Sequence, residues 1–99
     1  MIAIHVDIDN LWIYEQEYRT ALHTTPHYIF DHALMRALDL FALHNIRATF
    51  FIVGKDLALT SARNFCRETL SRGHRIANHT EGHPIDFATA TYEEKRREI

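Results

Sequence analysis

The sequence has 99 residues, of which 46% are hydrophobic and 24% charged. This length allows one small domain, and this composition is typical of a globular chain, which excludes disordered, collagen-like and fibrous classes. The formal net charge of −2 gives no reason to expect nucleic acid as a partner, and the absence of a signal segment or of an apolar run near ~18 residues predicts a cytoplasmic protein without a membrane span.

The first segment, residues 2–8, alternates apolar and polar side chains. Its even positions are Ile2, Ile4, Val6 and Ile8. A period of two predicts a β-strand with its even side against a hydrophobic layer. Asp7 and Asp9 then share the polar side at the end of the strand, and His5, deeper on that side, is expected to be a core residue.

Residues 10–26 have no clean period, since aromatic side chains alternate irregularly with charged ones. The turn-like Thr24-Thr25-Pro26 lies at the end of this interval, so we expect an ordered loop. Residues 28–45 then repeat apolar side chains every three or four positions, which predicts an amphipathic helix. The continuous apolar run 47–53 follows and fits a strand buried on both faces of a parallel sheet.

A second helical stripe runs through residues 58–69, and Gly73 stands where a C-cap glycine is expected. The stripe contains Cys66, the only cysteine, which can form no disulfide within the chain and is expected in the core. Residues 75–78 can form a third strand. Thr91 and Glu94 have the spacing of a capping box, which predicts the start of another helix.

The order strand, helix, strand, helix, strand, helix predicts an α/β fold with a parallel sheet and right-handed crossovers. Three parallel strands with two open edges make a poor free-standing fold. We therefore expect residues 1–99 to be a single partial domain, or a chain that completes its sheet with a partner, which allows a homo-oligomer through the open edge.

The residues that could bind a metal or transfer a proton lie where the first and third predicted strands end. His79 and His83 are separated by four positions, a spacing that puts both imidazoles on one side of a helical turn. Because parallel strands end at the same rim, Asp7 and Asp9 are expected to meet them there. Two imidazoles and one carboxylate leave positions open, as in a catalytic zinc site, and the second carboxylate is then free to act as a base.

Two plainer interpretations stay open for these residues. A histidine pair at this spacing arises by coincidence in a chain with eight histidines. Asp7 and Asp9 are also common residue types for capping the turn from a strand into a loop. The zinc-protease pattern does not apply, because it requires Glu directly after the first histidine, where this chain has Thr80.

Three segments, 6–9, 47–54 and 73–84, resemble the polysaccharide deacetylases of the NodB-homology type, carbohydrate esterase family 4, in this order along the chain. The third carries the family's His-Ser/Thr-x-x-His motif at His79, Thr80 and His83. The second contains the Ala-Thr-Phe-Phe strand. The first segment, 6–9, departs from the family's commonest form, in which two aspartates are adjacent. Here isoleucine separates Asp7 from Asp9, as in some relatives of the family.

The resemblance implies the N-terminal part of a distorted, TIM-barrel-like (β/α) barrel and a metal-dependent hydrolase that removes N-acetyl groups from a carbohydrate. It assigns Asp7 as general base and Asp9, His79 and His83 as ligands of a divalent metal, zinc in the first instance. The two aspartates could also exchange these roles. Trp12 and Tyr14 either stack on the sugar or simply pack at the barrel rim.

Two alternatives to this function remain. The same fold and ligands could hydrolyse a ring amide or another amide of a small non-sugar molecule, or the chain could be a non-catalytic metal-binding fragment. The family's catalytic acid and orienting arginine have no counterpart after Pro84, so the resemblance implies that both lie beyond Ile99. The chain alone is then expected to bind zinc without turning over substrate.

Overall fold

The computed structural model describes residues 1–22 and 25–99. The strands are β1 (Ile4–Ile8), β2 (Ala48–Ile52) and β3 (Arg75–Asn78). The α-helices are α1 (Leu11–Tyr18), α2 (Leu34–Leu43), α3 (Thr60–Ser71) and α4 (Tyr92–Glu98). Three short helical turns complete the chain, namely the π-helical η1 (Ile29–Ala33) and the 3₁₀-helical η2 (Gly54–Ala58) and η3 (Phe87–Thr89).

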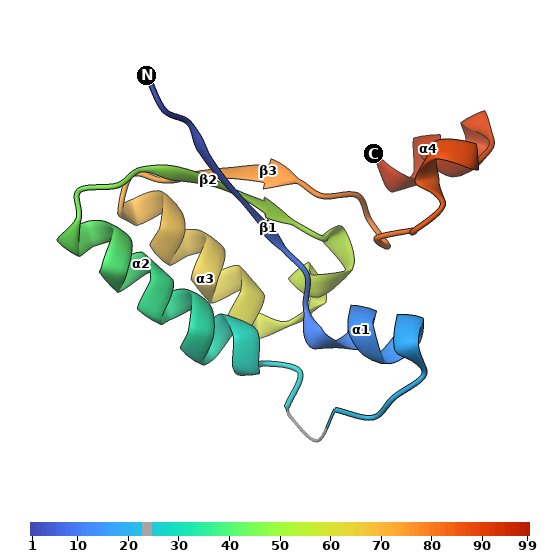
Figure 1. Cartoon of the computed structure of the whole chain (residues 1–99), viewed down its shortest axis with the longest axis horizontal. Helices are drawn as coiled ribbons and strands as arrows, with labels where there is room; N and C mark the ends of the chain where they lie inside the picture. Colours follow the sequence, from blue (N-terminus) through green and yellow to red (C-terminus); the bar gives the residue numbers. More distant parts are fainter. Residues whose placement is uncertain (23–24) are drawn as a thin grey trace.

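The three strands form one parallel sheet in the order β1-β2-β3, which confirms the predicted fold class. In the register, Asp7 lies opposite Phe51, and Ile52 lies opposite Asn78. All strands therefore end on the same side of the sheet. The chain runs from that end into α1 after β1 and into the segment that follows β3 (Figure 1).

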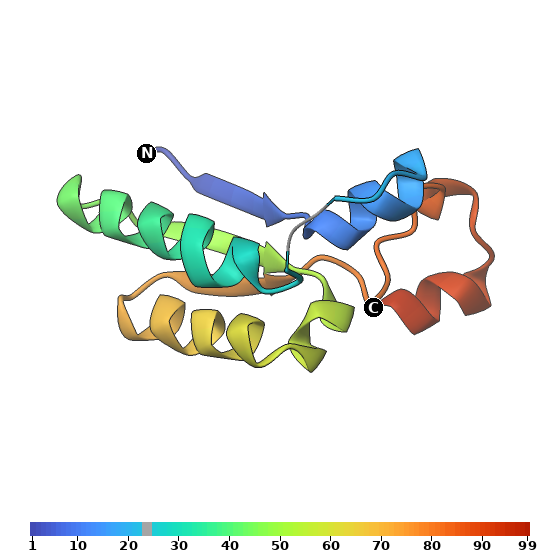
Figure 2. The ribbon, with the colours of Figure 1, turned by 90° about the horizontal axis from the view of Figure 1, so that it is seen from below.

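The hydrophobic core lies between one face of the sheet and the helices α2 and α3 (Figure 2). Alternate strand residues point into it, as a period of two requires. Its buried members are Ile8, Phe30, Leu34, Leu38, Ala48, Phe50, Ile52, Ala62 and Phe65. Sequential strand order with both helices on one face is the arrangement found in a segment of a (β/α) barrel.

The opposite face of the sheet is open among the described residues. Asp7 is exposed there, and Thr49 and Phe51 are only half-buried, so the prediction of a strand buried on both faces is wrong. His5 is exposed beside Phe51, with ring centroids 5.4 Å apart, so its expected place in the core is wrong as well. Both errors have one cause, because no described helix or strand covers this face.

The segment predicted to be a loop, residues 10–26, contains helix α1, so that prediction is wrong in part. Asn10 begins the helix in an extended conformation (φ −68°, ψ 156°), and its side-chain oxygen accepts a hydrogen bond from the Leu11 N–H. Only Ile13 of α1 is buried, so the helix lacks the apolar stripe that a period search detects. It ends at Arg19, which has a left-handed φ of 50°. Residues 23 and 24, part of the same predicted loop, lie outside the described residues.

The ends of the later helices agree with the sequence. Gly73 follows α3 with a φ of +80°, and its N–H donates to the carbonyl of Leu70 at 3.0 Å, as a glycine after a helix does. Thr91 and Glu94 form the predicted capping box at the start of α4. No helix in the described part of the chain is long and apolar enough to cross a membrane.

Candidate metal centre

Asp9 is the first residue after β1, at the end of the sheet where the strands stop. Its side chain is 31% exposed, but its Oδ1 atom is buried and has no hydrogen-bond partner among the described residues. A buried carboxylate oxygen without a partner costs free energy, so such an atom calls for an explanation. Two histidine side chains lie beside this atom.

His79 and His83 come from the loop that follows β3. The backbone N–H of His79 donates to the carbonyl of Ile52 at 2.9 Å and continues the pairing between β2 and β3. The predicted helical turn between the two histidines is wrong, since Thr80 and His83 have left-handed φ values of 64° and 52°. The Thr80 hydroxyl accepts the His83 N–H at 3.0 Å and closes the loop back toward β1.

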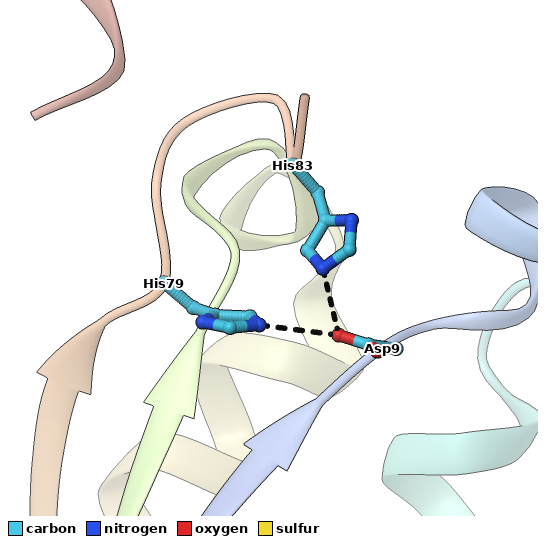
Figure 3. Close-up of side chains that lie close together, drawn as sticks. All are labelled: Asp9, His79 and His83. Carbon is cyan, nitrogen blue, oxygen red and sulfur yellow. Dashed lines mark ion pairs between the residues drawn. The ribbon is translucent and has the colours of Figure 1, made fainter. Parts of the chain in front are cut away.

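Both imidazoles point at the same carboxylate oxygen (Figure 3). The Nε2 atom of His79 lies 3.3 Å from Asp9 Oδ1, and the Nε2 atom of His83 lies 3.2 Å from it. Neither contact has hydrogen-bond geometry. The three ligand atoms lie within 4.8 Å of one another. Atoms bound tetrahedrally at 2.0 to 2.2 Å from one ion are separated by about 3.3 to 3.6 Å. The donor set and its spacing therefore fit a divalent metal.

The centre is open to solvent on one side. The side chain of His79 is 25% exposed and that of His83 is 23% exposed, so water has access to both imidazoles. The far ring nitrogen of His83, Nδ1, is buried and has no hydrogen-bond partner among the described residues. A group of three protein ligands with an open side is typical of catalytic rather than structural zinc.

Asp7, the predicted base, lies outside this group. It belongs to β1, on the open face of the sheet, and its side chain is exposed. The structure thus brings together Asp9, His79 and His83 and leaves Asp7 two residues away.

The two aromatic residues predicted to contact sugar differ in position. Trp12 lines a hollow of about 250 Å³ together with His83 and Gln16. Tyr14 is 40% exposed and stacks on Tyr18 with a centroid distance of 6.4 Å, outside the lining of that hollow. Trp12 also donates its indole N–H to Asp56 Oδ1 at 2.8 Å, a contact that no sequence pattern indicated.

A larger hollow of about 620 Å³ lies along the open edge of β3. Its lining is mainly apolar and includes Leu57, Cys66 and Leu70. Cys66 is only half-buried there, so its expected place in the core is confirmed in part, and burial raises the pKa of its thiol. No ligand of the candidate metal centre lines this hollow.

Comparison with known proteins points to one family. A sequence profile described as polysaccharide deacetylase matches residues 27–99. The chain is 34% identical over 64 residues to a peptidoglycan-N-acetylglucosamine deacetylase of Bacillus cereus, covering 65% of this chain and 22% of that protein. It is 35% identical over 68 residues to a chitooligosaccharide deacetylase of Rhizobium leguminosarum bv. trifolii, covering 69% of this chain and 30% of that protein.

The fold is also similar to a solved structure. This is the Bc1960 peptidoglycan N-acetylglucosamine deacetylase in complex with 4-naphthalen-1-yl-N-oxidanyl-benzamide. The TM-score is 0.62 at 28% sequence identity, and the match covers 98% of this chain and 35% of the solved one. The chain therefore spans about a third or less of the length of each protein that it resembles.

Proposed function

The chain belongs to the polysaccharide deacetylase family, and we propose that it supplies the metal centre of an enzyme that removes N-acetyl groups from an N-acetylated carbohydrate. The observation that carries this proposal is the convergence of Asp9, His79 and His83 around one unpartnered carboxylate oxygen. The relatives support the substrate class, since their names specify peptidoglycan N-acetylglucosamine and chitooligosaccharides.

In this proposal, Asp9, His79 and His83 hold a divalent metal, with zinc as the ion that two imidazoles and one carboxylate suit best. When bound, zinc supplies Lewis acidity for the acetamide carbonyl. The chain's contribution is a carboxylate and two ring nitrogens held in place before the ion arrives. The buried Oδ1 of Asp9, which no N–H satisfies, is the atom that gains most from the ion.

Asp7 is the proposed general base. Its exposed carboxylate lies two residues before Asp9 in the sequence and outside the group of ligands, so in this proposal it takes a proton from the attacking water without giving up a metal bond. The leaving amine needs a proton from another residue. We propose that this acid, and an arginine that orients Asp7, belong to the rest of the domain.

Trp12 and Tyr14 are proposed to contact the sugar. Trp12 is the stronger candidate, because it lines the hollow beside His83 and its ring is half-buried there. Lys55 Nζ lies over one face of this ring, 4.5 Å from its centroid, and we propose that the other face stacks on a pyranose ring. Tyr14 would serve only a longer substrate, since it lies outside that hollow.

We also propose that residues 1–99 form a single partial domain, the N-terminal portion of a deacetylase domain. Among residues 1–22 and 25–99, one face of the sheet is uncovered and the outer edges of β1 and β3 are unpaired, which supports this proposal. The match to 35% of a solved deacetylase chain agrees with it. A cytoplasmic location and a homo-oligomer through the open edge stay predictions.

The function is tested on a polypeptide in which these residues are followed by the rest of the domain. Metal content and acetate release from chitooligosaccharides are measured on the same preparations. We expect His79→Ala and His83→Ala to lose metal and acetate release together, while His32→Ala, an exposed histidine of η1, keeps both.

A different result would favour another function. If the protein holds its metal but releases no acetate from any N-acetylated sugar, and instead opens a cyclic amide, the sugar deacetylase proposal is wrong and the ring-amide alternative holds. If it holds metal and acts on neither class of substrate, the chain serves as a non-catalytic metal-binding part.

A further inference from the structure

The candidate metal centre has two arms, one carried by β1 and the other by the loop after β3. Asp9 is on the first arm, and His79 and His83 are on the second. These arms are far apart in the sequence, so other contacts must fix their positions relative to one another to within a fraction of an ångström. The segment 54–56, at the end of β2 between them, contacts both.

The histidine arm is held by two backbone hydrogen bonds from this segment. The N–H of Gly54 donates to the carbonyl of Thr80 at 2.8 Å, and that of Lys55 donates to the carbonyl of Glu81 at 2.9 Å. Both acceptors lie between His79 and His83. A Cβ atom at Gly54 would collide with the Glu81 side chain and lie 3.2 Å from the Glu81 Cα, so glycine permits this close approach.

The aspartate arm is held by the side chain of Asp56. Its Oδ1 atom accepts hydrogen bonds from the side-chain amide of Asn10 at 2.9 Å and from the indole N–H of Trp12 at 2.8 Å. Asn10 directly follows Asp9, and its own Oδ1 accepts the Leu11 N–H at 2.8 Å. The Asn10 carboxamide is thus held through both its nitrogen and its oxygen, and this also fixes the backbone next to Asp9.

The burial of this contact argues against a purely stabilising role. Asp56 is 2% exposed and Asn10 is 1% exposed, while the second carboxylate oxygen of Asp56 has no hydrogen-bond partner among the described residues. Burying a carboxylate with one unpaired oxygen costs free energy. The contact therefore stabilises the fold less than its two hydrogen bonds alone would, so its benefit is to be sought in the geometry of the site.

We propose that Asp56 is a positioning residue of the metal centre, which sets Asp9 relative to His79 and His83 through Asn10 and Trp12. This inference rests on the proposed function, since it assumes that the three residues bind a metal. Residues that orient metal ligands through hydrogen bonds typically change metal affinity by roughly 10- to 100-fold when they are removed.

The test is the affinity of the chain for Zn²⁺ alone, measured by competition with a chelator, together with the visible absorption spectrum of bound Co²⁺. Asp56→Ala removes both hydrogen bonds, and we expect the Zn²⁺ affinity to fall about tenfold or more. Asp56→Asn keeps an acceptor oxygen toward Asn10 and Trp12, and we expect its affinity to stay within about threefold of the unaltered chain. The Co²⁺ spectrum should change in Asp56→Ala and be restored in Asp56→Asn.

Thr69→Ala is the matched control. Thr69 is also fully buried with an unpartnered side-chain oxygen, but it belongs to α3, and no hydrogen bond in the described part of the chain joins it to either arm. We expect this change to lower the stability of the chain and to leave its Zn²⁺ affinity and Co²⁺ spectrum unaltered. Loss of stability alone is thereby separated from loss of positioning.

The outcomes are distinct. If the unaltered chain binds no Zn²⁺, the proposed metal centre is wrong and the inference falls with it. If the unaltered chain binds Zn²⁺ and folded Asp56→Ala binds it equally well, the inference alone is overturned. Should Asp56→Ala fail to fold, Trp12→Phe removes one of the two donors and keeps an aromatic ring. An affinity loss of about threefold to tenfold in that variant supports the proposal, and an unchanged affinity rejects it.

Discussion

The imidazole of His74 accepts a hydrogen bond from the backbone N–H of Ala48, with 3.1 Å between the Nδ1 atom and the amide nitrogen. His74 is buried before β3, and its ring meets that of Phe50 edge-on at a centroid distance of 5.5 Å. An Nδ1 atom that accepts cannot carry a proton, so the folded chain requires neutral His74. This contact gives His74 a structural role.

This contact predicts a loss of stability in acid. Burial lowers the pKa of His74 below its ordinary value of 6.5, and the positive charges of Arg47 and Arg72 lower it further. The unfolded chain therefore takes up the proton at a higher pH than the folded chain does. The stabilising contribution is complete above pH 6.5 and decreases as the pH falls from there toward the folded-state pKa.

The measurement is the urea midpoint of unfolding at pH 7.5 and at pH 5.5, compared with that of His74→Gln. Glutamine offers an acceptor oxygen to Ala48 and does not titrate. The other histidines are present in both proteins, so the difference between their pH profiles isolates His74. Parallel profiles would show that protonation of this ring does not matter to the fold.

A second prediction separates the two aspartates by metal content. Asp9→Asn weakens the ligand at the centre of the cluster, so we expect at least a tenfold loss of Zn²⁺ affinity. Asp7→Asn changes a carboxylate outside the cluster, so the metal should stay bound. Metal analysis after gel filtration checks both. Retention of metal by Asp9→Asn together with its loss from Asp7→Asn would exchange the roles proposed for the two residues.

A third prediction concerns metal addition and removal. An ion that binds only the folded chain raises its stability, by about 2.7 kcal/mol at a free concentration of 100 times the dissociation constant. We therefore expect Zn²⁺ to raise the thermal midpoint and a chelator to reverse the shift. His83→Ala should show no such shift, whereas His44→Ala, an exposed residue after α2, should respond as the unaltered chain does.

A fourth prediction tests the turn between α3 and β3. Gly73 has a φ of +80°, and a Cβ there would crowd the guanidinium of Arg47. An L-residue in this conformation costs roughly 1–2 kcal/mol, so Gly73→Ala should lower the free energy of unfolding by about that amount. Gly82→Ala is the control, because Gly82 is not among the positive-φ glycines. Equal losses in the two variants would contradict the backbone explanation.

The strands were predictable because each one leaves a local pattern. The alternation in residues 2–8 and the apolar run 47–53 are both typical of strands that pack against a hydrophobic layer. The parallel pairing of the strands follows from the helices that connect them. The shared rim of parallel strands also predicted that Asp9, His79 and His83 lie close together. The roles of these residues stay predictions.

Other features leave no such local signal. Helix α1 buries only Ile13, so no apolar period reveals it, although Asn10 is a residue type that favours a helix start. The left-handed φ values of Thr80 and His83 are imposed by the loop as a whole, since neither is a glycine. Asp56 meets its partners 44 and 46 positions away in the sequence, and only the folded chain brings them together.

The order of the strands has a practical consequence for every experiment above. Because β1 and β3 each border the sheet, each presents a row of backbone N–H and C=O groups to any strand that arrives from outside. A homo-oligomer through these rows stays a prediction, and a dilution series beside each measurement checks it. If residues 1–99 are the partial domain proposed above, a separately produced polypeptide with the rest of that domain should bind along these rows.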